Sequence, residues 1–217
     1  DYSSVSTLCH ELGHCINAEY FLQKQKKEKA DITIFAAEIA STTNEILLNQ
    51  YMLKTSNKND KKYYLRHFLD NVRSTIFRQI IFTEFELYAH QTIEKDIPIT
   101  YMDLNNHYLD LNKKFYGKSL IIPENLKYEW MCVPHFYSPY YVFTYATGLV
   151  CACVIANRLL SDNTFHKQYL NFLKNGTSKP AVDTLKAIDI DLTTDKPYKE
   201  AFEFIEKQLN TYKSLYK

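Results

Sequence analysis

Residues 6–21 read STLCHELGHCINAEYF, and HELGH at 10–14 places two histidines and a glutamate within five positions of a helical pattern. Apolar residues on either side of HELGH recur at the i, i+3 and i+4 spacing of an amphipathic helix, which predicts a helix that ends near Gln23. At about 100° per residue, His10 and His14 lie within roughly 40° of each other, so both imidazoles can reach one tetrahedral ion. The stretch therefore predicts a metal site carried by a helix.

The predicted helix has one apolar side and one small, polar side. The apolar side is expected to face the protein core, and its residues are Val5, Leu8, Cys9, Leu12 and Ile16. The two histidines of HELGH lie on the other side, beside Ser3, Thr7 and Asn17. A histidine that only packed in the core would be expected on the apolar side, so the location of both histidines on the polar side favours metal ligation. The expected N-cap is Ser3 or Ser4.

Two further residues of HELGH fit a functional helix. Glu11 follows His10, where a carboxylate can accept a proton from a water molecule bound to the metal. An exposed surface glutamate is the alternative interpretation. Gly13 destabilises a helix by roughly 1 kcal/mol relative to alanine, which indicates close approach of another backbone or of substrate. A glycine that is merely tolerated is the alternative there.

Zinc held by two histidines needs a third protein ligand and an open position for water. Residues 35–40 read FAAEIA and place Glu38 among small apolar residues on a second predicted helix. A carboxylate in such surroundings is costly to bury without a partner, so we expect Glu38 to be the third ligand. Glu45 lies seven residues later on nearly the same face. It either supports the ligands by hydrogen bonding or is simply solvated.

The composition favours an all-α fold. The chain has 217 residues, of which 46% are hydrophobic, and this is enough for a sizeable core. Only four glycines and six prolines accompany 18 tyrosines and 13 phenylalanines, which suits long helices better than a turn-dense β-sandwich.

A net charge of +1 gives no reason to expect nucleic acid or anionic lipid as a partner. No uninterrupted apolar run approaches the roughly 18 residues of a membrane span, so no membrane partner is expected.

Hydrophobic periodicity and helix-end signals predict a succession of helices along the chain. After the HELGH helix, they are expected over about 32–53, 61–94, 100–117, 139–161, 163–174, 180–188 and 197–216, with a loop at 54–62 and irregular structure at 118–138. A capping box formed by Thr100 and Asp103 is expected to begin one of them, which ends near Gly117. Pro139 is expected to open another at its first turn.

The cysteines indicate a reducing compartment. They number five and form no CxxC pair, so buried free thiols in the cytoplasm are favoured over disulfides or a cysteine zinc site. Four of them lie in apolar helical patterns, namely Cys9, Cys15, Cys151 and Cys153. The chain begins at Asp1, without methionine and almost inside a helix, which is expected of a cut end.

Four ordered motifs carry a family resemblance. They are HELGH at 10–14, FAAEIASTTNE at 35–45, FRQIIFTEFE at 77–86 and PHFYSPYYVFTYATG at 134–148. Together with the segment at 175–194, they resemble the oligoendopeptidase F branch of the thimet-oligopeptidase-like zinc metallopeptidases, over essentially all 217 residues. The resemblance implies a helical catalytic domain in which a zinc ion is held by the two HExxH histidines and a downstream glutamate, and it implies cleavage of short peptides inside a deep channel.

Matched position by position, the resemblance implies one zinc ion per chain, held by His10, His14 and Glu38. It also implies that Glu11 is the general base, which takes a proton from a zinc-bound water as that water attacks the peptide carbonyl. These roles agree with the interpretation of the same residues from helix geometry.

The aromatic motif receives its roles from the resemblance alone. His135 is implied to help bind the substrate and the transition state, together with tyrosine hydroxyls one helical turn apart. Tyr141 and Tyr145 have this i, i+4 spacing, and their hydroxyls can donate to an oxyanion. Tyr137 and Tyr140 are alternatives in a neighbouring register. Without the resemblance, a tyrosine-rich packed helix is the simpler interpretation.

Family enzymes are much longer than this chain. Residues 1–217 are therefore expected to be the C-terminal catalytic portion of a longer zinc endopeptidase, with short peptides as substrates and the absent N-terminal part as a further partner. One rival is a non-catalytic helical module that keeps zinc for structure or binds peptides without cutting them. Another is a helical interaction protein in which HELGH is coincidental. Related enzymes that remove residues from a peptide terminus compete within the enzyme class.

Overall fold

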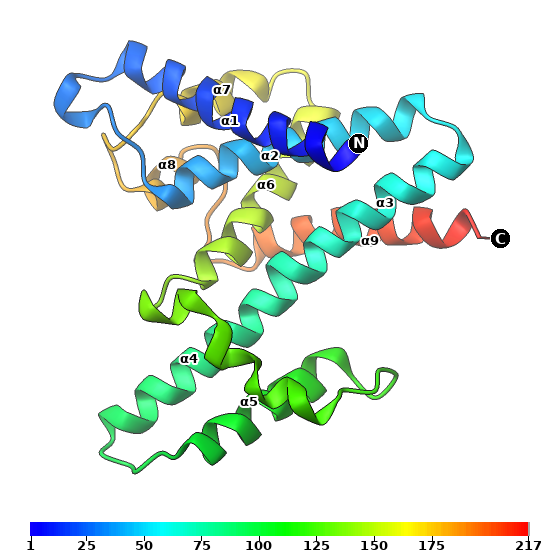
Figure 1. Cartoon of the computed structure of the whole chain (residues 1–217). Coiled ribbons are helices and arrows are strands. Elements are labelled where there is room, and N and C mark those ends of the chain that lie inside the picture. Colours follow the sequence, from blue (N-terminus) through cyan, green and yellow to red (C-terminus); the bar gives the residue numbers. More distant parts are fainter. Residues whose placement is uncertain (217) are drawn as a thin grey trace. The chain divides into compact units, whose positions relative to one another are not determined.

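A computed structural model describes residues 1–216, and it consists of helices joined by short connections (Figure 1). No β-strand occurs among these described residues, which confirms the all-α prediction. The α-helices are α1 (Tyr2–Lys24), α2 (Ile34–Thr55), α3 (Lys58–Val72), α4 (Arg78–Glu94), α5 (Tyr101–Tyr116), α6 (Phe143–Ser161), α7 (His166–Leu173), α8 (Ala181–Lys186) and α9 (Lys196–Ser214). A π-helical turn η2 (Arg73–Phe77) links α3 to α4, and the 3-10 helices are η1 (Lys27–Lys29), η3 (Glu124–Cys132) and η4 (Pro134–Tyr137).

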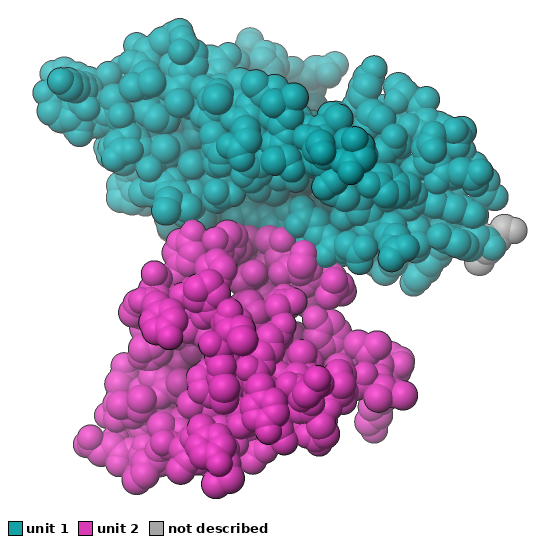
Figure 2. Space-filling model, in the orientation of Figure 1, with its two compact units in different colours: residues 1–72, 147–217 teal, residues 73–146 magenta. Residues whose placement is uncertain are grey.

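The chain forms two compact units, which Figure 2 shows in different colours. Unit 1 comprises Asp1–Val72 and the chain from Thr147 onwards, and unit 2 comprises Arg73–Ala146. The chain enters unit 2 through η2 and leaves it through the first turn of α6. Each unit has its own buried residues, and each is described by itself below.

The core of unit 1 is built around α6. Residues 149–156 of this helix are all buried, because they present apolar or small side chains in every direction. Near the end of α6, Arg158 donates two hydrogen bonds to the Glu200 carboxylate of α9, at 2.9 and 2.7 Å. A third bond from Arg158 reaches the carbonyl oxygen of Ile188 at 3.0 Å. These contacts tie the C-terminal helices of unit 1 to its core helix.

Helix α6 is also long and apolar enough to cross a membrane by length and composition. It is the one such helix among the described residues, and 56% of its apolar window is buried inside the protein. Its apolar character therefore has an explanation in the packing of unit 1.

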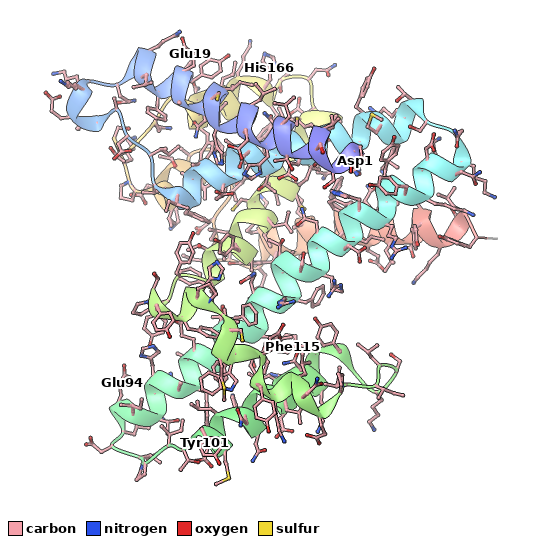
Figure 3. The ribbon with its side chains drawn as sticks, in the orientation of Figure 1. Asp1, Glu19, Glu94, Tyr101, Phe115 and His166 are labelled. Carbon is pink, nitrogen blue, oxygen red and sulfur yellow. The ribbon has the colours of Figure 1, made fainter. Side chains whose placement is uncertain are left out.

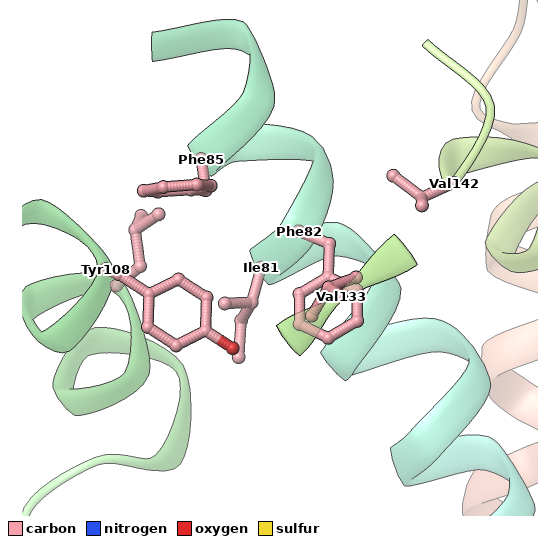
Figure 4. Packing of buried hydrophobic residues seen from close by; sticks show 7 residues of the cluster. Ile81, Phe82, Phe85, Tyr108, Val133 and Val142 are labelled. Atoms are coloured by element: carbon pink, nitrogen blue, oxygen red, sulfur yellow. The ribbon is translucent and has the colours of Figure 1, made fainter. Parts of the chain in front are cut away.

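The core of unit 2 lies largely between α4 and α5. The buried residues that form it are Ile81, Phe82, Phe85, Tyr108, Leu111, Val133 and Val142. Figure 4 shows the aromatic rings of this cluster around the Ile81 side chain. The hydroxyl of Tyr108 donates a hydrogen bond to Glu129, which also accepts one from Arg78, so this buried tyrosine has a polar partner. Unit 2 thus holds the segment at 134–146 against an aromatic core.

Several helix ends were predicted correctly from the residues next to them. Thr100 and Asp103 form the predicted capping box, in which the Thr100 hydroxyl accepts the N–H of Asp103 and the Asp103 carboxylate accepts the N–H of Thr100. Helix α5 ends at Gly117 as predicted, and the φ of Gly117 is 71°, where a glycine is unstrained. Each of these signals involves residues at most a few positions apart.

Three predicted helix beginnings were wrong. The N-cap of α1 is Asp1, whose carboxylate accepts the N–H of Ser4 at 2.9 Å. The loop predicted at 54–62 is short, because the Asn57 side chain accepts the N–H groups of Asn59 and Asp60 and so caps α3. Helix α6 begins at Phe143 rather than at Pro139, because Tyr140 between them has a φ of 56° and leaves the helical region.

The largest correction concerns the face that α1 buries. The side chains of Val5, Leu8, Leu12 and Ile16, which were predicted to face the core, are between 45% and 60% exposed. The buried residues of α1 are instead Ser6, Gly13, Asn17 and Phe21. Helix α1 packs along α2 through these mainly small residues (Figure 1), which allow the two backbones to approach closely. The polar side of the helix, with its histidines, therefore faces α2.

All five cysteines are free, as predicted, but only two of them are fully buried. Cys151 and Cys153 are buried in α6, whereas Cys15 is exposed, contrary to the prediction for it. Burial raises the pKa of the Cys151 thiol to about 12, because the thiolate is disfavoured away from water, and it raises that of Cys153 as well.

We expect this difference to appear in thiol labelling. Iodoacetamide reacts with thiolates, so at pH 8 it is expected to modify Cys15 and Cys132, both exposed, while Cys151 and Cys153 stay unmodified until the protein is unfolded. Peptide mass spectrometry over a time course measures each site, with labelling in urea as the control. Native labelling of Cys151 or Cys153 at the rate of Cys15 would contradict the burial of α6.

Candidate functional site

The three predicted metal ligands lie together in unit 1. His10 and His14 on α1 face Glu38 on α2, and the potential ligand atoms of all three lie within 4.8 Å of one another. The two Nε2 atoms are 3.1 Å apart. Nε2 of His10 lies 3.6 Å from Oε2 of Glu38, and Nε2 of His14 lies 3.7 Å from its other oxygen, Oε1. The half-buried cluster thus directs two imidazole nitrogens and a carboxylate at one point.

The geometry of this cluster fits a zinc ion. Zinc binds histidine nitrogen and carboxylate oxygen at about 2.0–2.2 Å, so neighbouring ligand atoms of a tetrahedral site lie about 3.3–3.6 Å apart. The two Nε2 atoms are 3.1 Å apart, and each lies 3.6–3.7 Å from a different oxygen of the Glu38 carboxylate, so the carboxylate faces both histidines at distances within a few tenths of an ångström of this spacing. Three protein ligands of this kind leave a fourth position open, which is typical of catalytic zinc sites.

Glu45 orients one of the histidines. Its Oε1 atom lies 2.6 Å from Nδ1 of His10, and its Oε2 atom accepts a hydrogen bond from the Ser6 hydroxyl at 3.2 Å. With the proton on Nδ1, the Nε2 lone pair of His10 points at the cluster, as metal ligation requires. The hydrogen bond from His10 to the Glu45 carboxylate raises the pKa of His10 above its usual value, although partial burial opposes this shift. Of the two interpretations open for Glu45, the structure supports the hydrogen-bonded one.

Gly13 sets the distance between the helices that carry the ligands. A Cβ atom at this position would lie 2.5 Å from the Cα atom of Ser41 on α2 and 3.1 Å from Nδ2 of Asn44. The first of these contacts is with backbone, which cannot move without moving α2. This confirms the prediction that another backbone approaches Gly13. The approach joins the helix that carries His10 and His14 to the helix that carries Glu38.

We expect Gly13→Ala to separate α1 from α2. The clash is expected to lower the free energy of unfolding by about 1–3 kcal/mol, the usual range for overpacking, and to weaken zinc binding because the ligands come from both helices. Gly148→Ala is the matched control, since Gly148 lies in helix α6 and has nothing within 4 Å of an added Cβ. It is expected to leave stability unchanged or raise it by up to about 1 kcal/mol. Urea unfolding and zinc titration measure both variants, and a Gly13→Ala protein equal to the parent in both would contradict the close approach.

Glu11 lies on α1 next to His10, and its side chain is exposed. After the Glu45 hydrogen bond, the negative charges of Glu38 and Glu11 also raise the pKa of His10. The role of general base for Glu11 stays a prediction.

The predicted aromatic residues form a second group, which lies in unit 2. The ring of His135, on η4, is nearly parallel to the ring of Tyr141, with an angle of 7° and 6.0 Å between centroids. Tyr145 presents its ring to His135 edge to face at 5.8 Å, and the two tyrosine hydroxyls lie 3.1 Å apart. The structure therefore brings these three residues together, while the alternative Tyr137 is 90% exposed. Their roles stay predictions.

One residue that was not predicted from the sequence is bonded to the turn beside this aromatic group. Glu86 on α4 is buried, and its carboxylate accepts the backbone N–H of Tyr140 at 2.7 Å. A signal was present in the sequence, because Glu86 stands between Phe85 and Leu87 in a largely apolar stretch. Helical periodicity places Glu86 beside the core residues of α4 rather than opposite them.

Comparisons with known proteins find likeness along nearly the whole chain. The family model described as Peptidase family M3 matches residues 1–204. Oligopeptidase PepF of Bacillus subtilis (strain 168) is 38% identical over 217 residues, which are 98% of this chain and 32% of that protein. Group B oligopeptidase PepB of Streptococcus agalactiae is 40% identical over 206 residues, which are 94% of this chain and 34% of that protein.

A solved structure shows the same likeness. The crystal structure of oligoendopeptidase-F from Enterococcus faecium matches this chain with a TM-score of 0.88 and 36% sequence identity, covering 99% of this chain and 39% of that one. These matches confirm the resemblance that the four sequence motifs indicate. The chain spans about a third of the length of the curated relatives that it matches.

Proposed function

The chain belongs to peptidase family M3, and on that premise we propose that it carries the catalytic residues of a zinc-dependent endopeptidase that hydrolyses short peptides. The observation that carries the proposal is the convergence of His10, His14 and Glu38 at separations that suit zinc. The names of the relatives, an oligopeptidase and an oligoendopeptidase among them, support short peptides as the substrate class. One zinc ion per chain follows from the single ligand cluster found among the described residues.

Bound zinc supplies Lewis-acid chemistry and makes water acidic enough to give up a proton near neutral pH. His10, His14 and Glu38 would hold the ion, and Glu45 would keep His10 in the tautomer that exposes Nε2. Glu11 accepts the proton of the attacking water and later delivers it to the leaving amine.

The aromatic group of unit 2 is proposed to act on the substrate carbonyl. His135 and a hydroxyl of Tyr141 or Tyr145 donate hydrogen bonds to the oxyanion that forms as the carbonyl is attacked. The loss of one such donor typically lowers kcat by about 10² to 10³. Because the chain spans a third of its relatives, we propose that it is the C-terminal catalytic portion of a longer enzyme, whose remaining polypeptide is its partner.

The five free thiols support a reducing compartment, and we propose that the protein works in the cytoplasm. A net charge of +1 gives no reason to expect nucleic acid as a ligand.

The proposal is tested by cleavage of short internally quenched fluorescent peptides. Protein loaded with one equivalent of zinc is expected to cut them at internal bonds, which mass spectrometry of the products identifies. A zinc chelator is expected to stop the reaction, and added zinc to restore it. Release of single residues from one terminus would contradict an endopeptidase, and tight zinc binding without cleavage would favour a non-catalytic zinc module.

A further inference from the structure

Glu86 is a buried carboxylate that helix packing alone does not explain. Its side chain is only 4% exposed, beside the Phe82 and Phe85 side chains of the unit 2 core. The Oε1 atom accepts the N–H of Tyr140 at 2.7 Å, whereas the Oε2 atom is buried without a hydrogen-bond partner. A buried polar group with an unsatisfied atom is costly, and such groups persist where they serve a purpose.

Tyr140 is the residue that Glu86 holds, and its backbone is strained. Its φ is 56°, in the left-handed region, where aromatic residues are rarely found. Burial of the ring does not hold this conformation, because the side chain is 43% exposed and its nearest ring partner is His90, at 5.1 Å. The bond from the Tyr140 N–H to a buried carboxylate is therefore the contact that best accounts for the strained turn.

The turn at Tyr140 joins the residues of the aromatic group. Ser138, at its start, donates its N–H to the carbonyl oxygen of His135 at 3.0 Å. Tyr141 follows the turn directly, and its carbonyl oxygen accepts the Thr144 hydroxyl at 2.6 Å at the beginning of α6. A change in the backbone at Tyr140 would thus move His135 and Tyr141 relative to each other.

We propose that Glu86 is a positioning residue that fixes the left-handed turn at Tyr140 and thereby orients His135, Tyr141 and Tyr145 for their role toward the substrate oxyanion. The catalytic part of this inference rests on the proposed function, and the structural part does not. Glu86 acts through the backbone of the turn, since its carboxylate accepts the Tyr140 N–H.

A purely structural role for Glu86 makes different predictions. If the carboxylate served only the stability of unit 2, its loss would lower the fraction of folded protein without changing kcat per folded molecule. Adding Tyr140→Gly to Glu86→Ala would then leave kcat unchanged. If Glu86 holds the turn, Tyr140→Gly should restore part of the kcat that Glu86→Ala loses, because glycine adopts positive φ without the steric penalty of tyrosine.

The experiment compares Glu86→Ala, Glu86→Gln, Tyr140→Gly and the double variant Glu86→Ala/Tyr140→Gly. Glu84→Gln is the control for the loss of a carboxylate on α4, since Glu84 is a partly exposed partner of Lys114. Steady-state cleavage of a quenched peptide gives kcat and KM separately. Hydrogen exchange followed by mass spectrometry, on a peptide that contains Tyr140, measures how well the Tyr140 amide is protected. This measurement does not depend on catalytic activity.

Glu86→Ala is expected to lower kcat about 100-fold with KM changed less than threefold, because the donors act in the transition state. It is also expected to expose the Tyr140 amide to fast exchange. Glu86→Gln keeps an oxygen that can accept this amide, so it should retain protection and kcat within about fivefold of the parent, as should Glu84→Gln. The double variant is expected to regain at least tenfold in kcat over Glu86→Ala.

Two results would overturn the inference. One is an unchanged exchange rate at Tyr140 in Glu86→Ala, and the other is a double variant no more active than Glu86→Ala. If Glu86→Ala does not fold, Glu86→Gln with fast exchange at Tyr140 would also overturn it. A parent that cleaves no peptide would refute the proposed function, while faster exchange at Tyr140 in Glu86→Ala would still support the control of the turn by Glu86.

Discussion

Replacing Glu38 by alanine is expected to reduce the zinc content from near one ion per chain to a small fraction of that value. The carboxylate is one of three converging ligands and the only one from α2, so its loss leaves two histidines on a single helix. We expect zinc affinity to fall by well over 100-fold, beyond the 10–100-fold cost of losing a residue that only supports a ligand. Elemental mass spectrometry on protein purified without added metal measures the stoichiometry, and His14→Ala should behave in the same way.

Two further variants serve as controls for the zinc affinity of Glu38→Ala. Glu45→Gln weakens the support of His10 without removing a ligand, so its affinity is expected to fall by about 10–100-fold. Glu28→Ala removes an exposed carboxylate of η1 and is expected to bind zinc like the parent. Full zinc content in Glu38→Ala would show that the third ligand is another residue.

Glu11→Gln is expected to keep its zinc and lose its activity. Glutamine has nearly the same size as glutamate but cannot accept a proton, so a general base is removed while the ligands stay in place. Loss of general-base catalysis typically lowers the rate by about 10² to 10⁴, and we expect kcat to fall within this range. Peptide cleavage and zinc content are measured on the same preparation.

Glu19→Gln is the matched control on the same helix. Glu19 is exposed about two turns beyond Glu11, as Figure 3 shows toward the far end of α1, and it is hydrogen-bonded to Gln23. It is expected to retain the activity of the parent. A Glu11→Gln variant with kcat within twofold of the parent would refute the assignment of the base.

Helix ends could be predicted where the signal is local. The Thr100 and Asp103 capping box and the glycine at 117 involve residues within a few positions of the helix end. The beginning of α6 could not be predicted in this way. The N–H of Tyr140 is bonded to Glu86, 54 residues earlier in the chain. The sequence around Pro139 contains no signal of that long-range contact.

The cluster of His10, His14 and Glu38 could be predicted because helix geometry fixes the spacing of the two histidines, and because Glu38 stands among small apolar residues. The direction in which α1 packs could not. Amphipathic patterns assume that the apolar side meets the core, whereas α1 meets α2 through Ser6 and Gly13. Close backbone packing between two helices leaves no apolar periodicity in the sequence.

The contact of Gly13 with the backbone of Ser41 also determines what would have to be copied to build this site elsewhere. A designer who grafted only the side chains of HELGH and Glu38 onto another helical hairpin would reproduce the ligand types but not the gap between them. The recipient scaffold would need two helices that cross at backbone contact, with a glycine on one at the crossing. The transplantable unit is therefore a pair of helices at a fixed separation, and the glycine belongs to it as much as the ligands do.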